Sequence, residues 1–171
     1  MAPASRPPDD EALVAAARQL GTALVDRGWQ LATAESCTGG MIGHVITQIP
    51  RSSDHYLGGI VSYSDAAKTA LLGVDAGLLA RVGAVSPEVA EAMADGAFER
   101  FPDAHLAISV TGIAGPDGGS DEKPVGLVYI GIATRGGGAT IERRVWPHDR
   151  DGNKRASVLM ALELALEAAR E

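Results

Sequence analysis

Short apolar stretches alternate along this chain with longer stretches that have the period of a helix, and this alternation restricts the fold more than any other feature. The helical stretches are residues 9–28, 42–49, 64–72, 75–82, 86–100 and a terminal one with Leu159, Leu162, Leu166 and Ala169 on one face. The strand-like stretches are residues 31–34, 57–63, 106–111, 125–134 and one that ends at Val145. We therefore predict an α/β fold with helices on both faces of the sheet, mixed because the turn at 135–138 favours an antiparallel hairpin.

The length and composition indicate one domain, residues 9–171, after a flexible tail of residues 1–8. The net charge of −7 disfavours nucleic acid as a direct partner, because that affinity needs clustered cations. A membrane partner is not expected either, since no apolar run reaches the roughly 18 residues of a span. The single cysteine and the absence of a secretory h-region favour the cytoplasm.

The segment TAESCTGG, residues 33–40, lies at a predicted junction between a strand and a helix. Ser36 is then beside unpaired backbone N–H groups, which favour a developing negative charge. Two interpretations stay open: Ser36 is a nucleophile, or Ser36 or Thr38 only caps the helix. Cys37 is a third candidate, because a helix N-terminus favours a thiolate.

A serine nucleophile needs a base, and none of the four histidines has an acidic partner that the sequence reveals. Tyr63 is predicted at the end of a strand and Lys68 one turn into the next helix. Both would then reach the strand-end rim where open α/β sheets bind ligands. The alternative for Lys68 is an ordinary solvated helix lysine.

The segment TGIAGPDGGSDEKPVG, from residue 111, contains too much glycine and proline for regular structure. Long ordered loops in compact domains are usually functional, and glycines let a ligand approach the backbone. We expect no metal, because Asp117, Asp121 and Glu122 do not have calcium-loop spacing. The candidate ligand contacts in this loop are Thr111, Gly112, Ala114, Gly115, Gly118 and Gly119.

Four segments together resemble one family: residues 33–40, 58–74, 83–97 and 109–130. It comprises the nicotinamide-nucleotide amidohydrolases, which share their domain with the C-terminal part of the competence/damage-inducible protein CinA. The resemblance extends over nearly the whole chain from about residue 9. It implies a three-layer α/β/α sandwich, no cofactor and a homodimer. It also implies hydrolysis of the carboxamide of nicotinamide mononucleotide to nicotinate mononucleotide and ammonia, in pyridine nucleotide recycling.

The resemblance assigns catalytic roles to Ser36 as nucleophile, Tyr63, Lys68 and Arg150. Arg150 follows His148-Asp149 where the family has glycine in place of the histidine. We expect Tyr63, assisted by the Lys68 cation, to take the serine proton. The expected substrate contacts in the first motif are Glu35, Thr38, Gly39 and Gly40, with backbone N–H groups near the last three as oxyanion donors.

A different class of function also fits the resemblance: a nucleotide-binding interaction module without turnover, in competence or the response to DNA damage. Ammonia release from the mononucleotide separates an enzyme from such a module. Retained activity in Ser36→Ala with loss in Cys37→Ala would favour the thiol.

Overall fold

The computed structural model describes residues 6–171, and in that range five strands form one sheet of order β2-β1-β3-β4-β5. The strands are β1 (Leu31–Glu35), β2 (Tyr56–Val61), β3 (Leu106–Gly112), β4 (Leu127–Thr134) and β5 (Gly138–Val145). The helices are α1 (Asp10–Arg27), α2 (Met41–Thr47), α3 (Asp65–Leu72), α4 (Ala76–Val82), α5 (Pro87–Arg100) and α6 (Arg150–Arg170), with a 3-10 turn η1 (Ser52–Asp54). The tail expected at residues 1–8 falls largely on residues 1–5, which lie outside the described range.

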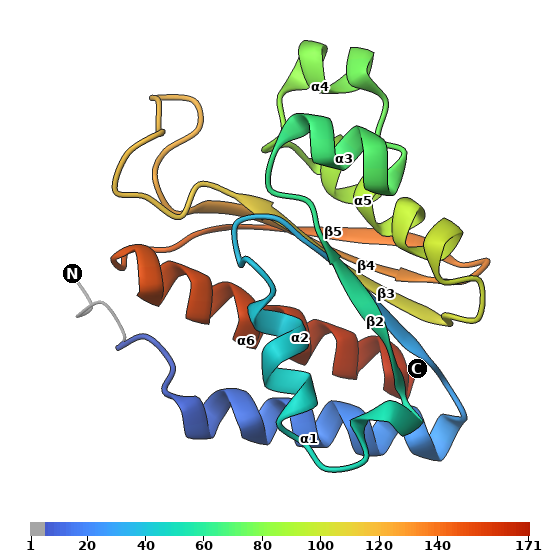
Figure 1. Ribbon diagram of the computed structural model, residues 1–171. Coiled ribbons are helices and arrows are strands. Elements are labelled where there is room, and N and C mark those ends of the chain that lie inside the picture. The colour runs from blue at the N-terminus through green and yellow to red at the C-terminus, as the bar shows by residue number, and fades with distance from the viewer. Residues whose placement is uncertain (1–5) are drawn as a thin grey trace.

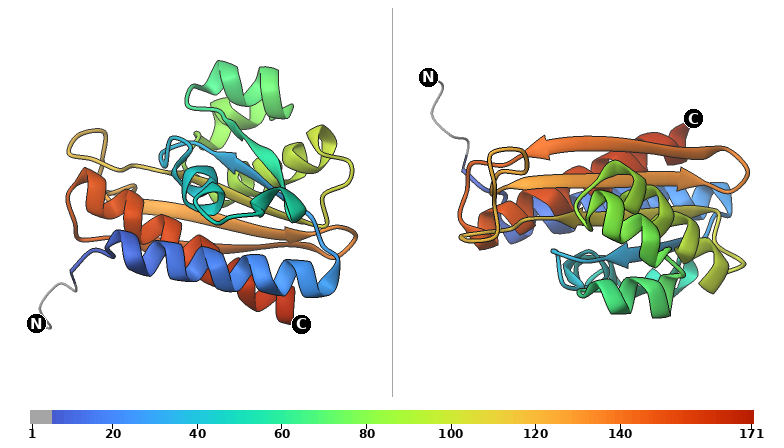
Figure 2. Two further views of the ribbon diagram at one scale, coloured as in Figure 1. Left: turned by 60° about the horizontal axis from the view of Figure 1, so that its bottom comes forward. Right: turned by 90° about the horizontal axis from the view of Figure 1, so that it is seen from above.

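The sheet separates two layers of helices (Figure 1). Helices α1, α2 and α6 pack on one face, and α3, α4 and α5 lie on the other (Figures 1 and 2). Strand β1 is parallel to both β2 and β3, whereas β4 is antiparallel to β3 and β5. The predicted α/β sandwich with a mixed five-stranded sheet is confirmed.

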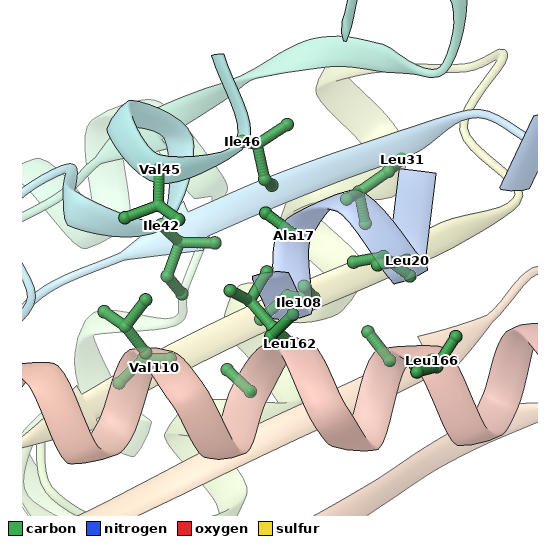
Figure 3. Packing of buried hydrophobic residues seen from close by; sticks show 14 of the residues in the cluster. Ala17, Leu20, Leu31, Ile42, Val45, Ile46, Ile108, Val110, Leu162 and Leu166 are labelled. Atoms are coloured by element: carbon green, nitrogen blue, oxygen red, sulfur yellow. The ribbon is translucent and has the colours of Figure 1, made fainter. Parts of the chain in front are cut away.

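The two faces of strand β3 pack differently against the two helix layers. Leu106, Ile108 and Val110 point to α1 and α6, where large aliphatic side chains fill the core (Figure 3). On the opposite face Ser109 donates a hydrogen bond of 2.6 Å to the carbonyl oxygen of Ala90 in α5. Small side chains on that face let α5 approach the sheet closely.

The local signals at the helix ends act as the sequence predicts. Ser64 caps α3 through the N–H of Ala67, Ser86 caps α5 through the N–H of Val89, and Gly73 ends α3 in the left-handed conformation. None of the helices described between residues 6 and 171 combines the length and the apolar character of a membrane span.

Strand β2 ends at Val61, two residues before the predicted end at Tyr63. The carbonyl oxygen of Ser62 accepts a hydrogen bond from Lys68 Nζ at 2.8 Å instead of continuing a strand ladder. Tyr63 consequently lies in the connection to α3 and is 62% exposed.

The parallel strands β1, β2 and β3 have their carboxyl ends at one edge of the sheet. The loop from β3 to β4 and the start of α6 lie at the same end of the molecule (Figure 2). Ligands of open α/β sheets bind at such an edge.

Candidate active site

Ser36 is held at the end of β1 by both neighbouring strands. Its N–H donates to the carbonyl oxygen of Val110 at 2.9 Å, and the N–H of Ser62 donates to the carbonyl oxygen of Glu35 at 2.8 Å. The Ser36 residue is only 6% exposed. The backbone that carries this hydroxyl is therefore part of the sheet rather than of a free loop.

The carboxylate of Glu35 holds the turn that follows Ser36. Its Oε2 accepts from Thr38 Oγ1 at 2.6 Å and from the N–H groups of Gly40 and Ile42, each at 3.1 Å. Its Oε1 accepts from the N–H of Gly43 at 3.0 Å. Because Glu35 is 2% exposed and its carboxylate is saturated from within the turn, it positions the turn rather than contacting a ligand.

Gly39 and Gly40 take left-handed backbone conformations, with φ values of 62° and 95°, so the turn needs glycine there. The N–H of Gly39 donates to the carbonyl oxygen of Ser36, and that of Gly40 donates to Glu35. Neither N–H is available as the oxyanion donor that we expected. Within residues 6–171, the N–H groups of Cys37 and Thr38 are the ones in this turn that donate no hydrogen bond.

Lys68 lies against Ser36 and is not solvated. Its Nζ donates to Ser36 Oγ at 2.9 Å, and the residue is 1% exposed. Burial lowers the pKa of Lys68 from its ordinary value, although the negative charge of Asp65 partly opposes that shift. A lowered pKa makes the neutral amine, which can accept a proton, easier to form.

Cys37 is a poor nucleophile in this position. The thiol is buried, and burial raises its pKa to about 12. The thiolate that sulfur chemistry requires is therefore scarce near neutrality. Of the three adjacent side chains, the Thr38 hydroxyl is bonded to Glu35 and the pKa of the Cys37 thiol is raised, whereas the Ser36 hydroxyl contacts an amine.

Tyr63 and Arg150 form a second pair across the site. Arg150 Nη2 donates to Tyr63 Oη at 2.9 Å, and its Nη1 donates to the carbonyl oxygen of Gly115 at 2.6 Å. Tyr63 thus bonds to Arg150 in this structure, whereas Lys68 is the side chain beside Ser36. This arrangement favours Lys68 over Tyr63 as the partner of the serine.

These side chains open into one pocket of about 260 Å³. All four predicted catalytic residues line it: Ser36, Tyr63, Lys68 and Arg150. From the loop after β3 it is lined by Thr111, Gly112, Ile113, Ala114, Gly115, Asp117 and Gly118. Gly119 lies outside the lining, where a Cβ would meet the backbone nitrogen of Val125.

Several residues of the site were not predicted as contacts from the sequence, among them Ile113 and Asp117 of the loop. Ala84 and Val85, just before α5, line the pocket, and nothing in their chemistry distinguishes them. Asn153 is 1% exposed and links α6 to the loop by donating from Nδ2 to the carbonyl oxygen of Ala114 at 3.0 Å. An amide on the inner face of a helix was the available signal for Asn153.

Within the described residues, no cluster of three or more His, Cys, Asp or Glu side chains is placed to hold a metal ion.

Comparison with known proteins identifies the family. The sequence profile of the CinA C-terminal domain matches residues 14–169. The chain belongs to the CinA C-terminal domain family. A competence-damage inducible protein of Moorella thermoacetica is 49% identical over 88% of the chain and 36% of its own length. A CinA-like protein of Mycolicibacterium vanbaalenii is 49% identical over 82% of the chain and 33% of its own length.

The chain thus spans about a third of the length of these two CinA relatives. A solved CinA-family structure matches throughout: the crystal structure of the competence/damage inducible protein CihA from Agrobacterium tumefaciens. It shares 41% identity with a TM-score of 0.88, over 98% of this chain and 99% of that one.

Glu35→Gln is expected to destabilise the protein by about 2 kcal/mol or more, because an amide NH₂ must face backbone N–H groups that now meet carboxylate oxygens. The turn would loosen, so activity should fall at least tenfold. Urea unfolding and turnover measure both effects. The exposed Glu88→Gln in α5 is the matched control, and a stability loss for Glu35→Gln no larger than that of the control would contradict the role of the carboxylate.

Proposed function

We propose that this CinA-family domain hydrolyses the carboxamide of nicotinamide mononucleotide to nicotinate mononucleotide and ammonia, for pyridine nucleotide recycling. The observation that carries the proposal is the 2.9 Å hydrogen bond between Lys68 Nζ and Ser36 Oγ, two residues that line one pocket. A hydroxyl paired with a desolvated amine is a means of nucleophilic catalysis without histidine. The choice of substrate rests on the resemblance to the nicotinamide-nucleotide amidohydrolases.

In the first step, neutral Lys68 accepts the Ser36 proton while Ser36 Oγ attacks the carboxamide carbon. Burial supports this step because it lowers the pKa of Lys68. The backbone bonds of Ser36 to Val110 and of Ser62 to Glu35 keep the nucleophile fixed. Fixed geometry reduces the entropy cost of the attack.

The oxyanion of the tetrahedral intermediate needs hydrogen-bond donors. The N–H groups of Cys37 and Thr38 fit this role, since neither donates a hydrogen bond within the described chain. Lys68 then returns its proton to the leaving nitrogen, ammonia departs, and Lys68 helps water to cleave the acyl-enzyme. No metal or cofactor has a role in this sequence of steps.

The opposite wall of the pocket would hold the nucleotide. Arg150 supplies a positive charge for the phosphate, and its bonds to Tyr63 and Gly115 fix the guanidinium. The glycines of the loop would let the ribose or the ring approach the backbone. Cytoplasmic location and a homodimer belong to the same proposal and rest on the resemblance.

The names of these relatives refer to competence and damage and describe no reaction. A non-catalytic module would not need a buried lysine beside a serine, because burying an amine lowers stability. The pair therefore favours an enzyme.

The purified protein is expected to release ammonia from nicotinamide mononucleotide, and Ser36→Ala to lower the rate by roughly a thousandfold or more. Cys37→Ala, the adjacent matched control, should stay within a few fold of the wild type, because the thiol is protonated. A coupled ammonia assay measures these rates. Full activity in Ser36→Ala would refute the serine mechanism.

Lys68→Met is expected to lower kcat by roughly 10²- to 10⁴-fold while leaving thermal stability equal or higher, because a buried amine is replaced by a thioether. In the wild type, kcat should fall as the pH drops through the lowered pKa of Lys68, since protonation removes the base. Lys123→Met is the control, because Lys123 also donates to a carbonyl, that of Val82, but lies outside the pocket lining. A kcat of Lys68→Met within fivefold of the wild type would exclude the amine as base.

A further inference from the structure

Ser62 carries a buried hydroxyl without a partner beside the Ser36 and Lys68 pair. In residues 6–171 only two buried side-chain polar atoms lack a hydrogen bond, Ser62 Oγ and His55 Nδ1. His55 lies at the other end of β2, next to its first residue. Ser62 is 0% exposed, and a buried unpaired hydroxyl lowers stability, so its position calls for a physical reason.

Both backbone polar groups of Ser62 are already hydrogen-bonded, one to Glu35 and one to Lys68. Its N–H donates to the carbonyl oxygen of Glu35 at 2.8 Å, and its carbonyl oxygen accepts from Lys68 Nζ at 2.8 Å. Within one serine residue, Oγ and the carbonyl oxygen are never more than roughly 5 Å apart. The hydroxyl therefore belongs to the same residue whose carbonyl oxygen binds Nζ, and rotation about χ1 moves it between staggered positions at different distances from Nζ.

The hydrogen bonds of Lys68 leave room for one more acceptor. An ammonium has three N–H donors, and the structure provides two acceptors, Ser36 Oγ and the carbonyl oxygen of Ser62. At 1% exposure, the third N–H has little access to water. One donor and one hydroxyl thus remain unpaired on neighbouring groups.

We propose that Ser62 is a positioning residue whose hydroxyl rotates to accept a hydrogen bond from Lys68 Nζ once Lys68 has taken the proton of Ser36. The inference rests on the Ser36 nucleophile of the proposed function but not on the identity of the substrate.

The proton balance is simple. The O–H bond of Ser36 breaks, its proton forms a third N–H bond on Lys68, and the Ser36 oxygen bonds to the electrophile. Two N–H groups of the new ammonium then bond to Ser62, and the third faces the reacting centre to return a proton to the leaving group. Ser62 keeps its own proton throughout.

Other charged or titratable groups near Lys68 do not replace this acceptor. Asp65 of its own helix acts on Lys68 through charge, the Cys37 thiol of the facing turn is protonated, and Tyr63 and Arg150 bond to each other across the pocket. None of these four forms a hydrogen bond with Nζ among residues 6–171. A neutral hydroxyl can therefore stabilise the transient ammonium without holding Lys68 permanently protonated.

The test uses a fluorophosphonate, which reacts with an activated serine by forming an O–P bond and releasing fluoride. Its reaction with Ser36 is followed by mass spectrometry across a pH series, alongside ammonia release from nicotinamide mononucleotide. The variants are Ser62→Ala and the isosteric pair Ser62→Val and Ser62→Thr, which differ in one hydroxyl. Ser109→Ala is the control, because it removes another fully buried serine hydroxyl away from the pocket. Thermal unfolding checks that each variant is folded.

Ser62→Ala and Ser62→Val should react with the fluorophosphonate roughly tenfold to a hundredfold more slowly at the pH maximum, as expected for losing one hydrogen bond to a charged group. The acidic limb of each pH–rate profile should move to lower pH, because losing a hydrogen-bond acceptor destabilises the ammonium form of Lys68 and so lowers its pKa. Ser62→Thr should restore both the rate and the limb, and Ser109→Ala should change neither.

The inference is overturned if folded Ser62→Val matches Ser62→Thr within twofold in rate with the same acidic limb. It is also overturned if Ser62→Thr is as slow as Ser62→Val, since side-chain shape would then be the cause. If the labelling profiles follow the expectation but the mononucleotide releases no ammonia, the substrate proposal fails and the role of Ser62 stands. Labelling at a residue other than Ser36 refutes both proposals.

Discussion

The contact between the buried amine of Lys68 and the hydroxyl of Ser36 is the interaction on which the rest of the site depends. An amine removed from water destabilises the folded state, so the fold must hold it firmly for the contact to persist. Helix α3 carries Lys68 and is capped by Ser64. It packs closely against α5 at Gly96, where a Cβ would overlap the carbonyl oxygen of Leu72. Burial of the amine lowers the pKa of Lys68, and perturbed pKa values are common at functional sites.

A second constraint holds the backbone of Ser36 in place. The hydrogen bond from the Ser36 N–H to the neighbouring strand fixes the backbone as far as Ser36. The carboxylate of Glu35 fixes the turn that follows Ser36 through four hydrogen bonds. The two unpaired N–H groups of the turn, at Cys37 and Thr38, belong to the segment between these two anchors. Rigid support on both sides is what preorganised donors require.

The side of the pocket opposite Ser36 is formed by the glycine-rich loop, which helix α6 holds in place. Arg150 and Asn153, one turn apart on α6, bond to the carbonyl oxygens of Gly115 and Ala114 and so hold the glycine-rich loop against the helix. The pocket therefore lies between Ser36, which the sheet holds, and a loop that α6 holds. This division suits a ligand whose reacting end and recognised end are separate.

Much of this architecture could be predicted from local sequence signals. The caps at Ser64 and Ser86 and the strand-to-helix junction at Ser36 are set by residues within a few positions of one another. The family resemblance assigned catalytic roles to Lys68 and Arg150. Their hydrogen-bond partners, however, belong to distant segments of the chain. Lys68 and Ser36 are 32 positions apart, and Arg150 and Tyr63 are 87 apart.

These side-chain contacts depend on the residue at which each strand ends and on how closely each helix packs against the sheet. The prediction that Tyr63 would end β2 was wrong by two residues, and this changed the expected neighbour of Ser36 from Tyr63 to Lys68. The internal role of Glu35 was equally hidden, because no local pattern shows that a carboxylate is saturated by the turn that follows it.

The most direct test of the central claim is a crystal structure of the protein with nicotinate mononucleotide bound. The account predicts that the product carboxylate lies beside Ser36 Oγ, with one oxygen accepting from the N–H groups of Cys37 and Thr38 and the phosphate near Arg150. A carboxylate that faces the Cys37 thiol, or that lies outside the pocket bounded by Ser36 and Lys68, would contradict it.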